Sequence, residues 1–137
     1  MATSWFTRLP GWFSDGDVGK VFVFNAGAAN IATGTKFGSI QIKNDFSVPL
    51  TIQSVRAILA TAPTTQSAIF DVNVDGTTIF TTQANRPTIA AAATDSGSVT
   101  NMEVVTIAPG SVLTVDVDQI GSGTVGAGLT LTVTCRS

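Results

Sequence analysis

The chain has 137 residues, enough for one domain that buries its own hydrophobic core. Its formal net charge is -2 and its basic residues form no cluster. The chain therefore lacks the basic surface patch that binding to nucleic acids or to anionic membranes requires. It contains no histidine, which excludes Ser-His-Asp and Cys-His catalysis and imidazole metal ligands.

Residues 1–17 differ from the rest of the chain and are predicted to form an N-terminal arm. Pro10-Gly11 breaks any helix that could span this segment. The arm carries a dense set of large apolar side chains, which are the candidate partner-binding residues: Trp5, Phe6, Leu9, Trp12 and Phe13. Such an arm could dock on a neighbouring subunit, anchor at a membrane surface or fold over its own core. Arg8 is its only cation, which disfavours the membrane, and the later strands already supply a core, which favours docking.

From residue 18 onward the sequence predicts strands separated by turns, so we expect residues 18–137 to form one β-sandwich domain. The third predicted strand is long, and the shift in its apolar phase between Ile52 and Val55 predicts a β-bulge or a bend. Asp75-Gly76 predicts a two-residue hairpin turn, because both central positions of such a turn need positive φ. The strands expected in this half are residues 21–24, 37–42, 50–61, 68–74 and 77–81.

The second half begins with residues 82–101, a low-complexity segment that we expect to form a surface excursion with a short strand at 88–89. The strands expected after it are residues 102–107, 112–120 and 129–134. Together these patterns predict an all-β fold, an antiparallel sandwich of two sheets with about eight strands. The strand number, the long third strand and the lack of a Cys-Trp-Cys framework favour a jelly roll over an immunoglobulin-type sandwich.

Asp116 and Asp118 are the strongest candidates for chemistry, and Asp71 could join them. Two carboxylates two residues apart lie on one face of a strand, where they could hold calcium or act as acid and base in sugar hydrolysis. No loop with ligand spacing surrounds them, and Glu103 is the only glutamate. We therefore interpret the pair as a solvated strand face and expect no metal, no cofactor and no enzymatic activity.

The glycines at 121, 123 and 126 match the spacing of the dinucleotide-binding fingerprint. That fingerprint must open a helix, whereas a Thr-rich predicted strand follows here, so we interpret residues 121–128 as a hairpin loop. The single cysteine, Cys135, cannot form an intrachain disulfide and is interpreted as an incidental apolar side chain. No secretion leader and no apolar run of membrane-spanning length is found, which predicts synthesis and assembly in a cytoplasm.

Charged residues make up only 12% of the chain, about half the usual share in a soluble domain, which predicts that part of the surface is buried against partners. From Thr51 to Val133 the chain also resembles a jelly-roll module that recurs in tailed-phage virion proteins. The resemblance is carried by VRA at 55–57, APT at 62–64, FDVNVDGTTIF at 70–80, RPTI at 86–89, LTVDVDQIGS at 113–122 and GLTL at 128–131. Asp75-Gly76 stands where the family usually has Asn-Gly, and alanines at 90–93 replace a usual glycine.

The resemblance implies a head decoration module or a domain appended to a tail or fibre protein, and it implies no catalytic residues. We expect a capsid decoration or cement subunit of a bacteriophage: a homotrimer in the virion that binds the major capsid protein, with no nucleic acid, membrane or small-molecule substrate as partner. The alternative is a tail or fibre module that recognises a host-surface glycan. The loops at 25–35, 82–101 and 121–128 contain no aromatic residue, which disfavours sugar binding. A glycosidase that uses Asp116 is a distant third hypothesis.

Overall fold

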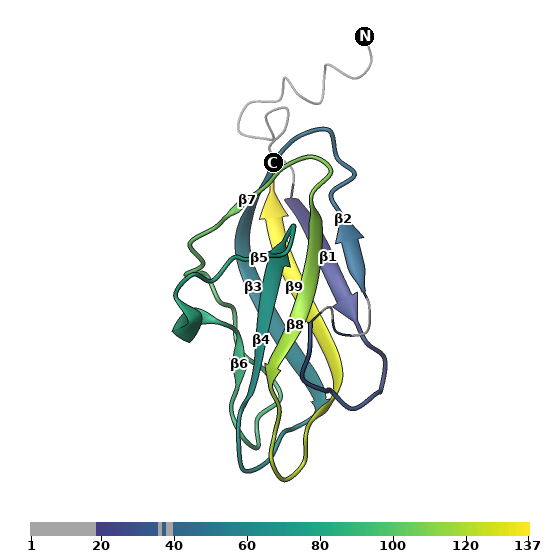
Figure 1. Cartoon of the computed structure of the whole chain (residues 1–137), viewed down its shortest axis with the longest axis vertical. Helices are drawn as coiled ribbons and strands as arrows, with labels where there is room; N and C mark the ends of the chain where they lie inside the picture. Colours follow the sequence, from purple (N-terminus) through teal and green to yellow (C-terminus); the bar gives the residue numbers. More distant parts are fainter. Residues whose placement is uncertain (1–18, 36, 38–39) are drawn as a thin grey trace, which may run out of the picture.

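The computed structural model describes residues 19–35, 37 and 40–137, so the predicted arm lies outside the described residues. Within them the chain folds as two antiparallel sheets packed face to face, which confirms the predicted all-β sandwich. Figure 1 shows β4 and β8 of one sheet in front of β3 and β9 of the other. A short 3₁₀ turn, Gln83–Asn85, lies in the excursion that follows β5.

The four-stranded sheet has the order β1-β9-β3-β7 and the five-stranded sheet the order β2-β8-β4-β5, with β6 also paired to β4. The strands of the first sheet are β1 Gly19–Asn25, β9 Ala127–Arg136, β3 Leu50–Thr61 and β7 Thr106–Ile107. Those of the second are β2 Gln41–Lys43, β8 Val112–Gln119, β4 Ala68–Val74, β5 Thr77–Thr78 and β6 Thr88–Ile89. Early strands thus pair with late ones: β1 with β9, β2 with β8, and β3 with β7. This is one long hairpin wrapped across two sheets, the topology of a jelly roll.

The hydrophobic core lies between the sheets, because apolar residues alternate along β3, β4, β8 and β9 with residues that face outward. The largest fully buried side chains are Phe70, Phe80, Ile31, Leu50, Leu59, Ile79, Ile89, Ile107, Leu113, Leu129, Leu131 and Val55. Cys135 belongs to this core, and burial raises the pKa of its thiol to about 11. The thiol therefore stays protonated and packs as an apolar group.

The longest strand, β3, has the predicted bounds, and its pairing with β9 shifts between Ile52 and Ser54. The shift confirms the predicted bulge and lets Ile52 and Val55, three residues apart, both enter the core. The excursion is not separate from this strand: the amides and carbonyls of Val55 and Val99 exchange hydrogen bonds of 2.8 and 2.9 Å.

The strand predicted at 37–42 begins only at Gln41. Two other predicted strands are also much shorter than expected. The strand predicted at 77–81 ends at Thr78. The Phe80 amide donates a hydrogen bond to the Thr78 hydroxyl at 3.0 Å, so this amide bonds locally and not to a neighbouring strand. The strand predicted at 102–107 exists only at Thr106–Ile107, because the amides of Glu103 and Val104 both donate to the Ile79 carbonyl at 3.1 Å. Burial does not alternate in either segment, since the adjacent Ile79 and Phe80 are both fully buried in the first. Hydrogen bonds outside the sheets take backbone groups that strand pairing would use.

The turn between β4 and β5 has the predicted hairpin geometry, with φ of 51° at Asp75 and 83° at Gly76. A Cβ at position 76 would meet no atom within 4 Å, so a substitution there is strained by its backbone alone. Gly76→Val is therefore expected to lower the free energy of unfolding by about 1 kcal/mol or more. Urea unfolding measures the change, and Gly76→Asn is the control because Asn tolerates positive φ. Equal stabilities for both variants and the unsubstituted protein would contradict the assigned turn.

Candidate functional site

The outer face of the five-stranded sheet is polar, and its strands bring distant residues into register. Gln41 of β2 lies opposite Thr114 of β8, which lies opposite Asn73 of β4, so the three form one row across the sheet. In the next row Asp116 lies opposite Asp71. Asn73 donates from its amide Nδ2 to Asp116 Oδ2 at 2.8 Å, which ties the two rows together.

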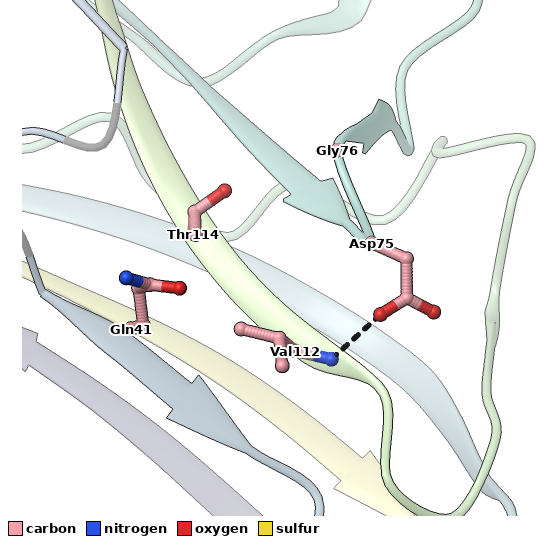
Figure 2. Close-up of a pocket in the computed structure, with 5 residues that line it drawn as sticks. All are labelled: Gln41, Asp75, Gly76, Val112 and Thr114. Carbon is pink, nitrogen blue, oxygen red and sulfur yellow. Dashed lines mark hydrogen bonds between the residues drawn. The ribbon is translucent and has the colours of Figure 1, made fainter.

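Two adjoining hollows open on this face, and they share Gly76 and Thr114. We call them together the polar hollow, which is lined by Thr35, Gln41, Asn73, Asp75, Gly76, Val112, Thr114 and Asp116. Figure 2 shows one half, with Gln41 on β2, Val112 and Thr114 on β8, and the Asp75-Gly76 turn at the end of β4. The Val112 amide donates to Asp75 Oδ1 at 2.9 Å, and this bond holds the pKa of Asp75 below its usual value.

Thr114 is the most informative residue of the polar hollow. Its side chain lies on the outward face of β8, between Gln41 and Asn73, and the residue is only 5% exposed. Its hydroxyl has no hydrogen-bond partner among the described residues, although it lines both hollows. No buried side-chain oxygen or nitrogen of the described residues lacks a partner, so this hydroxyl is open to solvent. It therefore leaves a donor and an acceptor available to an occupant of the polar hollow.

The three candidate carboxylates lie on this same outer face, as their alternation with apolar residues predicted. Each of them forms a hydrogen bond or an ion pair with a neighbouring side chain. Asp118 pairs with Arg86, with Nη1 and Oδ2 2.5 Å apart. Burial raises the pKa of Asp71, although the hydrogen bond that the Thr78 hydroxyl donates to it at 2.7 Å opposes that change. Asp116 accepts from Asn73. In residues 19–35, 37 and 40–137, no three cysteine, aspartate or glutamate side chains gather closely enough to hold a metal ion.

The outer face of the four-stranded sheet is different, because apolar side chains and threonines cover it. We call it the valine face, which consists of Val21, Val23, Ile58, Thr130, Thr132 and Thr134. Val21 is 59% exposed, Val23 50% and Ile58 41%. Strand β1 is also the edge of its sheet: it pairs with β9 on one side, and no strand of the described residues pairs with its other side.

Charged residues lie at the margin of the valine face and not among the residues that define it. Two cations lie beside it: Arg56, whose register partner is Thr132, and Arg136, which follows Thr134 in the outward row of β9. Arg56 Nε donates to Asp95 Oδ1 at 2.9 Å, and this guanidinium lowers the pKa of Asp95 to about 2. The pair is neutral at all but very acidic pH, so the apolar side chains dominate how this face meets other molecules.

The segment 121–128 was predicted to be a hairpin loop, and this prediction is wrong. Strands β8 and β9 lie in different sheets, so the segment crosses from one sheet to the other. It is fixed at its crossing, where the Thr124 amide donates to the Thr64 hydroxyl at 2.6 Å and the Gly123 amide to the Thr64 carbonyl at 3.2 Å. Strand β9 follows it, and not the helix that a dinucleotide site needs.

The predicted partner-binding residues of the arm lie outside the described residues: Trp5, Phe6, Leu9, Trp12 and Phe13. Sequence reasoning did not single out Thr114, Gln41 or Asn73. The alternation of β8 places Thr114 on an outward face, but its neighbours come from strands about 40 positions and more away, and only the register joins them.

Comparison with known proteins finds no matching family model and no matching curated protein. Among the described residues, no helix is long and apolar enough to cross a membrane.

Proposed function

We propose that this chain is a structural protein of a phage virion, a decoration or cement subunit that stabilises the capsid by contacts with other protein chains. The valine face is the observation that supports the proposal most. An apolar face with three side chains exposed by 41–59% costs free energy in water and is stabilised when another protein covers it. The low charge of the chain and its resemblance to phage modules point in the same direction.

The predicted arm supplies the second contact of this proposal. It immediately precedes β1, the edge strand that carries Val21 and Val23. Aromatic side chains bury large areas and dominate interface energetics. In the proposed homotrimer, closed symmetry lets all three subunits use the same apolar residues for contacts with the major capsid protein.

The experiment is co-sedimentation with purified phage capsids, together with the mass of the free protein by light scattering. We expect a trimeric mass and saturable capsid binding. Val23→Lys is expected to weaken binding at least about tenfold without changing the melting temperature, because it places a charge in the contact. Val48→Lys is the matched control, since Val48 is 39% exposed but lies between β2 and β3, outside the valine face.

A monodisperse monomer at micromolar concentration would exclude the trimer. Normal capsid binding by Val23→Lys would show that the valine face is not the contact, and no binding by the unsubstituted protein would exclude the decoration function.

A further inference from the structure

We propose that the polar hollow binds a neutral sugar unit of a glycan, in addition to the protein contacts that the proposed function requires. The ligand class follows from the groups that line the hollow: two hydroxyls, two carboxamides and two carboxylates, beside the short apolar surface of Val112. Hydroxyls, amides and carboxylates together donate to and accept from the vicinal hydroxyls of a sugar.

The Thr114 hydroxyl is the centre of the proposed site. Thr114 is only 5% exposed as a residue, but it lines both hollows, and its hydroxyl has no protein partner in the part of the chain that the structure describes. A sugar hydroxyl placed beside it would take the place of solvent at this donor and acceptor. Gln41 and Asn73 flank it in the same row, so their carboxamides lie beside the same ligand group.

The charges of the polar hollow select against anionic ligands. Asp75 and Asp116 both line it, whereas Lys43, the register partner of Val112, is not among its lining residues. The Val112 amide fixes Asp75 Oδ1, so this carboxylate is oriented before any ligand arrives. Carboxylates accept hydrogen bonds from sugar hydroxyls but repel phosphate, sulfate and sialic acid.

The shape of the polar hollow fits a single ring rather than a deeply enclosed ligand. Gly76 leaves its rim open, since even a Cβ there would meet nothing within 4 Å. Val112 offers an apolar surface to the C–H face of a ring, in place of the aromatic platform that the loops lack. A shallow site with so little apolar area is expected to bind one sugar with a Kd of about 1 mM or weaker.

The test is titration of the full chain with methyl α-glucoside, methyl β-galactoside, methyl α-mannoside and N-acetylglucosamine, followed in amide proton–nitrogen correlation spectra. At least one of them is expected to shift the amides of Gln41, Gly76 and Thr114 at concentrations up to about 50 mM. N-acetylneuraminic acid, which is anionic, is expected to shift none of them. No shift at these amides with any of the four neutral sugars, or equal shifts with the anionic one, would overturn the proposal.

Thr114→Val removes the hydroxyl and keeps the shape of the side chain, so it is expected to weaken sugar binding about fivefold or more. Thr132→Val is the matched control, because Thr132 lies on a strand of the other sheet, in the valine face. Sugar binding retained by Thr114→Val would overturn the central role of this hydroxyl. Capsid co-sedimentation is expected to be unchanged in Thr114→Val, so failure of the sugar site and failure of the decoration function give different results.

Discussion

Deletion of residues 1–16 is expected to abolish capsid binding while the sandwich still folds. The deletion removes Trp5 and Trp12 together with the other apolar residues of the arm. A buried aromatic anchor contributes about 2 kcal/mol to an interface, so loss of the two tryptophans alone predicts about a thousandfold weaker binding. The strands from β1 onward supply the apolar residues of the described core, so far-ultraviolet circular dichroism should retain the β signal.

The single substitutions Trp5→Ala and Trp12→Ala separate an anchor from a general effect of shortening the chain. Each is expected to weaken co-sedimentation about thirtyfold, which corresponds to about 2 kcal/mol. Thr3→Ala, in the same arm, is the control and should bind normally. If the shortened protein binds capsids and forms trimers as before, the arm is no partner-binding segment. If it fails to fold, the arm belongs to the chain's own core.

The second large effect is expected at Gly121, where β8 leaves the five-stranded sheet. A Cβ at this position would lie 1.9 Å from the Thr124 carbonyl oxygen, 2.9 Å from Pro63 Cβ and 3.0 Å from the Thr64 amide nitrogen. Two of these three atoms belong to the backbone, so the crossing itself must move. Gly121→Ala is therefore expected to lower the free energy of unfolding by about 3 kcal/mol, at the upper end of the usual cost of overpacking.

Thermal unfolding measures this loss, which corresponds to a fall in melting temperature of roughly 10 °C for a chain of this size. Gly19→Ala is the control, because a Cβ at Gly19 would come no closer than 4.0 Å to the Cys135 carbonyl oxygen and the residue has no positive φ. Its melting temperature should change by no more than about 2 °C. An unchanged melting temperature in Gly121→Ala would contradict the crossing between the two sheets at this position.

The sequence by itself determined the strand character of this protein, because alternation along one strand is a local property. The bounds of β3, the bulge after Ile52 and the turn at Asp75-Gly76 follow from residues that are neighbours in the chain. The number of strands and the lack of a Cys-Trp-Cys framework also favoured the jelly roll that the strand order confirms.

Only the tertiary structure decided which segments share their hydrogen bonds. Residues 77–81 and 102–107 have the composition of strands, yet the first segment leaves its sheet after Thr78 and the second joins its sheet only at Thr106. The Ile79 carbonyl accepts hydrogen bonds from the amides of the second segment. The crossing at 121–126 likewise follows from the packing of two sheets and not from its glycines. The polar hollow depends on the register of β2, β8 and β4, which brings Gln41, Thr114 and Asn73 into one row. Register joins residues distant in sequence through backbone pairing and core packing, and no local pattern of residues encodes that distance.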